Sequence, residues 1–163
     1  MTSRPLAAVL VVWACAVAVG IVLMTRYDST QGATASAPAT WPRSSSIIPA
    51  RFGATVVMFV HPDCPCTRAS RAELAEISRT APPTTELIIT SDLAEARRFG
   101  AQTSGDVVVY DAAGALRFHG GITISRGHVG HNLGHARVDA IVHGASTGVA
   151  QTPVFGCALE ASS

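Results

Sequence analysis

After residue 50, apolar runs alternate with amphipathic stretches, and the alternation predicts a set of strands and helices. Ala54 to Val60 is an apolar run of the kind that forms a buried strand. Thr67 to Arg79 places Ala69, Leu74 and Ile77 at helical spacing and therefore predicts a helix. The polar residues between the two runs mark a strand-to-helix junction.

The rest of this region continues the alternation. We expect a strand, a short helix, a hairpin and a last helix, at residues 85–90, 91–99, 106–119 and 129–143. Asp92 marks the start of the short helix and Gly100 its end, while Gly120-Gly121 breaks the hairpin. The predicted order is β-α-β-α-β-β-α, which indicates one α/β domain over residues 51–163.

The N-terminal segment has a different pattern. Leu6 to Met24 is a stretch of 19 residues without a charge, and it is long enough to cross a bilayer as a helix. The Ala-x-Ala motifs at 33–37 lie about ten residues beyond it, which is late for signal cleavage, so we favour an uncleaved anchor over residues 1–26. Residues 27–50 are rich in Ser, Thr, Ala and Pro and are predicted to be a flexible linker.

Charge and cysteine content narrow the function classes. The formal net charge is +1 with no run of basic residues, so nothing indicates nucleic-acid binding. Cys15 lies in the apolar segment as a small lipid-facing residue, leaving three cysteines in the domain. An exposed thiol pair is better suited to use outside the cytosol. We therefore expect a single-pass protein of the cytoplasmic (inner) membrane with an extracytoplasmic domain.

The motif His61-Pro-Asp-Cys64-Pro-Cys66-Thr67 lies at the strand-to-helix junction. Unpaired N–H groups at a helix start favour a thiolate, which is the form that performs disulfide exchange or binds soft metals. Cys64 is the candidate attacking thiol and Cys66 the natural resolving thiol. A cationic His61 imidazole would stabilise the thiolate, while a neutral one could bind a metal.

The Cys-x-Cys spacing leaves the disulfide partner open. A Cys64–Cys66 bond would close a small, strained ring and would be easily reduced. Thr67 occupies the position of the second cysteine of a Cys-x-x-Cys motif, and it could cap the helix or hydrogen-bond the thiolate. Cys157 could pair with either cysteine or supply a further soft metal ligand.

The element order, with the cysteines after the first strand, resembles the thioredoxin fold, a mixed sheet flanked by helices. Gly105 stands where membrane-tethered thioredoxins have a cis-proline. The chain more closely resembles small membrane-anchored bacterial proteins of the RedB-like family. The segments that carry this resemblance are 61–70, Ser104-Gly105, 120–123, 125–128 and 152–157.

The resemblance indicates the fold more than the reaction. From the cysteine motif and the anchor we expect a membrane-tethered thiol–disulfide oxidoreductase that needs no cofactor and acts on protein thiols or disulfides beside membrane-associated redox partners. The alternative is a copper- or zinc-binding delivery protein of the same fold that serves the assembly of membrane redox enzymes. Its ligands would be Cys64 and Cys66 with His61, Cys157 or His128. Peroxide reduction at Cys64, with Thr67 and Arg68 nearby, is a third possibility.

Five other polar residues are candidates for the site, although the sequence patterns that indicate them are weaker. His128, His131 and His135 are spaced three and four apart, which would place them on one helix face, either solvated or binding a metal. Asp106 stands beside the Gly105 loop, where it could tune the cysteine site. Arg126 could neutralise an anionic group near the cysteines.

Overall fold

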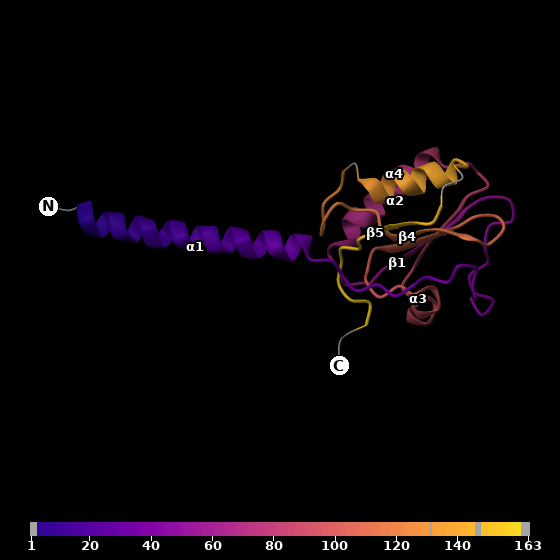
Figure 1. Cartoon of the computed structure of the whole chain (residues 1–163), viewed down its shortest axis with the longest axis horizontal. Helices are drawn as coiled ribbons and strands as arrows, with labels where there is room; N and C mark the ends of the chain where they lie inside the picture. The colour runs from indigo at the N-terminus through magenta and orange to yellow at the C-terminus, as the bar shows by residue number, and fades with distance from the viewer. Residues whose placement is uncertain (1–2, 131, 146–147, 161–163) are drawn as a thin grey trace. The chain divides into compact units, whose positions relative to one another are not determined.

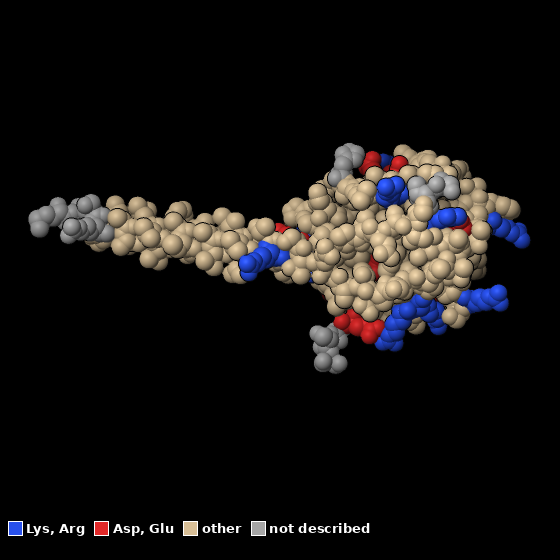
Figure 2. Space-filling view, viewed as in Figure 1, with Lys and Arg blue, Asp and Glu red and all other residues tan. Residues whose placement is uncertain are grey.

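The computed structural model describes residues 3–130, 132–145 and 148–160, and it divides the chain at Thr30 into two units. The first unit contains helix α1 (Ser3–Ser29). From Pro5 to Ser29, α1 is long and apolar enough to cross a membrane. Figure 2 shows uncharged side chains along most of its length. The second unit contains all the other helices and strands that the structure describes.

A five-stranded mixed sheet forms the centre of the second unit (Figure 1). The strands lie in the order β2-β1-β3-β4-β5. Strand β1 pairs parallel with β2 and antiparallel with β3, β3 and β4 form the predicted hairpin, and β5 runs parallel to β4. The strands are β1 (Thr55–Phe59), β2 (Glu86–Thr90), β3 (Asp106–Tyr110), β4 (Leu116–Gly121) and β5 (Ala150–Thr152).

Helices cover both faces of this sheet. Helices α2 (Thr67–Thr80) and α4 (Leu133–Val142) lie on one face and α3 (Leu93–Phe99) on the other (Figure 1). Side chains of β3 alternate between the two cores, with Val107 on the α2–α4 face and Val108 on the α3 face. All residues of β1 are buried, as expected for a strand covered on both sides. The predicted mixed α/β architecture is therefore confirmed.

Two features at the end of the hairpin differ from the sequence prediction. Gly120-Gly121 does not break the hairpin but belongs to β4, and β5, which no pattern predicted, pairs with it. A Cβ on Gly120 would lie 2.2 Å from the carbonyl oxygen of Thr152. The glycine is therefore needed for close approach of two strands rather than for a turn.

The last helix is shorter than predicted. It begins at Leu133 rather than at Val129, and Asn132 is its N-cap, because the Asn132 Oδ1 accepts the His135 N–H at 2.9 Å. Residues 122–130, which were expected to be helical from Val129, are irregular instead, and this segment carries Arg126.

Residues 31–50, which we name the strap, pack along the α3 face of the domain instead of forming the free linker expected from their composition. The Tyr110 hydroxyl donates to the Pro38 carbonyl at 2.8 Å. The Trp41 ring meets those of Phe99 and Tyr110 edge to face, with ring centres 5.0 and 5.2 Å apart. One tryptophan and a series of backbone contacts thus order a segment that has few apolar residues.

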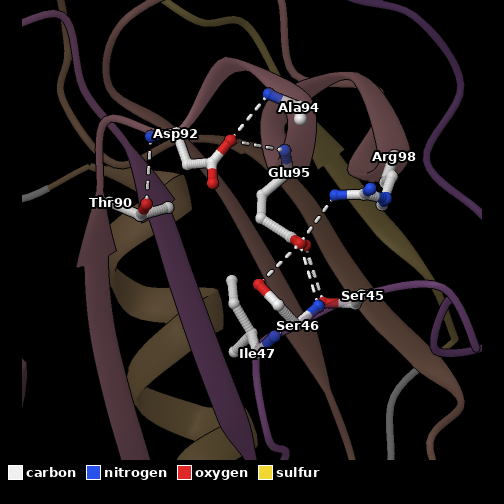
Figure 3. Close-up of polar contacts among 8 residues, drawn as sticks. All are labelled: Ser45, Ser46, Ile47, Thr90, Asp92, Ala94, Glu95 and Arg98. Carbon is white, nitrogen blue, oxygen red and sulfur yellow. Dashed lines mark hydrogen bonds and ion pairs between the residues drawn. The ribbon is translucent and has the colours of Figure 1, made fainter.

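A buried carboxylate fixes the far end of the strap (Figure 3). The Glu95 side chain on α3 accepts the Ser45 hydroxyl at 2.7 Å and both the N–H and the hydroxyl of Ser46 at 2.9 Å. The Arg98 guanidinium donates to the same carboxylate at 2.8 Å. Burial opposes ionisation of Glu95, but the Ser46 N–H, the two hydroxyls and Arg98 outweigh it and lower its pKa. Glu95 therefore joins α3 to the strap as a carboxylate.

Candidate functional site

The structure places the two motif cysteines at the junction that the sequence predicted. The Cys64 N–H donates to the His61 carbonyl at 3.2 Å, and the Thr67 N–H donates to the Cys64 carbonyl at 3.2 Å, so the chain turns directly from β1 into α2. Cys66 occupies the N-cap position of α2. Both cysteines are buried, with 6% and 8% of their surface exposed.

The C-terminal segment brings Cys157 to the same place. The Ser104 N–H donates to the Cys157 carbonyl at 2.8 Å, which fixes this segment beside the loop before β3. Gly156 permits the close approach, since a Cβ there would lie 1.9 Å from the Ser104 carbonyl oxygen. All four cysteines of the chain are free thiols in the structure. The three cysteines of the domain therefore form one cluster, although Cys157 lies far from the other two in sequence.

The environment of Cys64 favours its thiolate. Burial disfavours the charge, but hydrogen bonds from the Cys157 thiol and N–H, the Thr67 hydroxyl and the Cys66 N–H outweigh burial and lower the pKa of Cys64 to about 6. At pH 7 most Cys64 side chains are thus ionised, whereas an ordinary thiol is only a few per cent ionised.

The other two thiols remain protonated. Burial and the adjacent Cys64 raise the pKa of Cys66, against an opposing effect of Arg126. The hydrogen bond that Cys157 donates to Cys64, followed by burial and the charges of the other thiols, raises the pKa of Cys157 to about 11, again opposed by Arg126. Cys64 is therefore the thiolate of the cluster at neutral pH, and the protonated thiols of Cys66 and Cys157 lie in contact with it.

Ser104 is a site residue that the sequence analysis did not identify as functional. Its hydroxyl lies 2.9 Å from the Thr67 hydroxyl and accepts the His61 N–H at 2.8 Å. Thr67 is the first residue of α2 and bonds the thiolate, so it does not act as the helix cap. The position of Ser104 just before Gly105 was the sequence feature that could have identified it as a site residue. Spacing along the chain, however, could not show that this loop packs against the cysteine motif.

Gly105 has the left-handed backbone that glycine favours, with φ of 92°, and its N–H donates to the Phe59 carbonyl at 2.8 Å. No cis peptide bond occurs in the described ranges. The loop therefore packs against the end of β1 with a glycine at the position expected for a cis-proline.

His61 makes a local contact. Its Nδ1 accepts the Asp63 N–H at 3.2 Å, and the groups that lower the pKa of Cys64 do not include its imidazole. The backbone of His61, through Ser104, is the part of the residue that is connected to the cluster.

The described histidines of the last helix region do not share one helix face, because each has a different partner in the structure. His128 is exposed and its Nδ1 contacts the Ser125 hydroxyl at 2.9 Å, whereas His135 Nδ1 lies 2.5 Å from the Glu73 carboxylate. His131 lies outside the described residues. Within the described ranges, no group of three or more His, Cys, Asp or Glu side chains has an arrangement that could hold a metal ion.

Asp106 has a buried partner of its own. Its Oδ2 lies 3.2 Å from His119 Nε2 inside the domain, and burial raises the pKa of the carboxyl against the opposing effect of His119. His119 is itself buried, with 4% of its surface exposed.

Comparison with known proteins supports the fold alone. No protein-family model matches the chain, and a search of curated protein sequences found no match. A hypothetical protein from Sinorhizobium meliloti 1021 has a similar structure, with a TM-score of 0.54 and 22% identity over 80% of this chain and 93% of that one. An uncharacterised conserved protein from Geobacillus kaustophilus gives a TM-score of 0.47 and 16% identity over 82% and 94%.

Proposed function

We propose that this protein is a membrane-tethered thiol–disulfide oxidoreductase with a thioredoxin-like domain, and that Cys64 is its attacking thiol. The observation that carries the proposal is the environment of Cys64. Its buried sulfur, at the start of a helix, accepts hydrogen bonds from a thiol and a hydroxyl, and its pKa is lowered to about 6. Such a cysteine is a thiolate at neutral pH and retains a leaving-group pKa suited to exchange.

The fold supports the thioredoxin-like part of the proposal. The order of the core elements is β-α-β-α-β-β-α, and the site lies after the first strand. Strand β5 and the strap are additions around that core. The resemblance of the motif segments to RedB-like proteins fits the same assignment.

Helix α1 supports the tether, since its described length and composition suit a single membrane crossing. We place the domain on the extracytoplasmic side of the cytoplasmic membrane, because three thiols in contact suit a compartment in which disulfides persist.

The proposed reaction has two exchange steps. The Cys64 thiolate attacks one sulfur of a substrate disulfide, forms a mixed disulfide and releases the other sulfur as a thiolate. A second protein thiol loses its proton and attacks the Cys64 sulfur, which releases the substrate as a dithiol and leaves a disulfide in the protein. A partner protein with a dithiol then reduces that disulfide and becomes oxidised itself.

The test is reduction of a probe disulfide by the reduced full-length protein in detergent. We expect Cys64→Ser to abolish exchange and Cys15→Ala to leave it unchanged, with metal analysis on the same samples. Exchange at the parental rate in Cys64→Ser would reject the proposal. Unreactive thiols accompanied by about one equivalent of copper or zinc would instead favour metal delivery.

A further inference from the structure

Cys66 is poorly placed to form a short bond with Cys64. The carbonyls of Cys64 and Cys66 accept the N–H groups of Thr67 and Ala69 at 3.2 and 3.1 Å, so residues 64–66 lie in tight hydrogen-bonded turns that lead into α2. Residues two apart in such a turn do not face each other. Although the two thiols are in contact, a bond of about 2.05 Å between the sulfurs requires the turn to unwind.

Cys157 has no such constraint. It comes from a separate segment, and its thiol donates a hydrogen bond to the Cys64 sulfur. The Cys157 carbonyl is held by the Ser104 N–H, and Gly156 packs directly against the Ser104 carbonyl. The Cys157 sulfur is therefore already directed at the atom that it would attack.

Arg126 joins the two halves of the cluster. Its Nη1 donates to the Gly156 carbonyl at 2.5 Å, and its guanidinium also donates to the Cys66 sulfur. The Arg126 side chain thus holds the peptide that precedes Cys157 and also contacts the Cys66 sulfur. The loop that carries Arg126 is fixed in turn, since the Gly130 N–H donates to the Glu73 carboxylate at 2.6 Å.

We propose that Cys157, not Cys66, resolves the mixed disulfide on Cys64, and that Arg126 is the positioning residue that holds the Cys157 segment within reach. This inference rests on the proposed function. In the step, Cys157 gives its proton to solvent, its sulfur bonds to Cys64, and the substrate sulfur leaves with the electron pair of the broken bond.

The charge of Cys64 sets the order of events. While Cys64 is a thiolate, its charge and the hydrogen bond to it keep the proton on Cys157. Formation of the mixed disulfide removes both effects, while burial still opposes ionisation of Cys157 and Arg126 still favours it. The resolving thiol therefore becomes more reactive after the first step.

The test uses the reduced full-length protein in detergent, in a Cys15→Ala background, mixed with one equivalent of 5,5′-dithiobis(2-nitrobenzoate). The Cys64 attack releases one thionitrobenzoate and resolution releases a second. We expect two equivalents from the parent and from Cys66→Ser. From Cys157→Ser we expect one equivalent, with the label retained on Cys64. Peptide mapping of the oxidised parent, which requires no substitution at the site, should find a Cys64–Cys157 disulfide.

The role of Arg126 is tested by measuring the rates of the first and the second thionitrobenzoate release separately. We expect Arg126→Gln to slow the second release about tenfold while the first changes little, because one charge-assisted hydrogen bond to the Cys157 segment is lost. Arg126→Lys should recover part of the rate, and Arg79→Gln on the exposed side of α2 is the control. Equal slowing of both phases would overturn the positioning role.

The two proposals fail in different ways. Absence of the first release, or its persistence in Cys64→Ser, would reject the proposed function. A fast first release with a mapped Cys64–Cys66 disulfide, or a second release lost in Cys66→Ser and retained in Cys157→Ser, would overturn the resolving role of Cys157 alone.

Discussion

The reactivity of Cys64 depends on atoms that come from separate parts of the chain. The Thr67 hydroxyl and the Cys66 N–H belong to the start of α2, whereas the Cys157 thiol and N–H belong to the C-terminal segment. Burial alone would keep Cys64 protonated. The hydrogen bonds reverse this effect, so the thiolate predominates at neutral pH only when the segments are assembled.

The first prediction concerns the pH dependence of this thiol. A lowered pKa means that the thiolate, which is the alkylated form, appears as the pH rises through about 6. We expect the rate of Cys64 alkylation by iodoacetamide to rise with a midpoint near that pH, measured by peptide mass after timed quenching. A midpoint at the ordinary thiol value near 8.5 would contradict the assigned environment.

The second prediction concerns Thr67. Thr67→Val keeps the side-chain shape but removes the hydroxyl that bonds the Cys64 sulfur. A hydrogen bond to a charged group contributes ~1.5 kcal/mol, so the alkylation midpoint should rise by about one pH unit. Thr67→Ser, which keeps a hydroxyl, is the matched control. The same midpoint in both variants would show that the Thr67 hydroxyl does not stabilise the thiolate.

At the scale of elements, the sequence predicted those features that local chemistry determines. Helix α3 begins after Asp92 and ends at Gly100 as expected, because the Asp92 carboxylate caps it and Gly100 adopts the left-handed backbone. The strap could not be predicted from composition, since backbone hydrogen bonds, a single tryptophan and the distant Glu95 carboxylate hold it. The contact of Cys157 with Cys64 likewise depends on tertiary packing, which spacing along the chain does not reveal.

The third prediction tests how the strap is attached. Glu95→Gln replaces a buried carboxylate, whose partners all donate hydrogen bonds, by an amide that donates in turn (Figure 3). We expect the free energy of unfolding to fall by about 2–3 kcal/mol and the strap to become sensitive to protease. Glu160→Gln, at an exposed pair with Arg97, is the control. An unchanged urea midpoint would show that this carboxylate does not stabilise the fold.

At the scale of the whole molecule, two units with opposite surface properties lie in one chain. Helix α1 is apolar on every side. On the face of the domain in view, basic side chains gather along the lower edge beside acidic ones, and the other charged side chains are spread among uncharged ones (Figure 2). The first unit therefore suits lipid, whereas the second carries charged side chains that suit water.

The fourth prediction concerns the anchor. Replacing Val11 and Val19 by arginine should release the protein from membranes into the soluble fraction, because each charge near the centre of a span costs about 2.5–3.5 kcal/mol. The measurement is partition after an alkaline carbonate wash, with Val11→Leu and Val19→Leu together as the control. Retention of the arginine variant in the membrane pellet would argue against α1 as a membrane span.

The position of Cys157 also has a consequence for biosynthesis. It enters the growing chain about 90 residues after Cys64, which is roughly 5–20 s at ordinary rates of translation. During that interval Cys64 and Cys66 have no third thiol beside them, and the first bond open to them is the strained one between close neighbours. A chain oxidised early would therefore have to rearrange that disulfide, or have it reduced, before it could act on another protein.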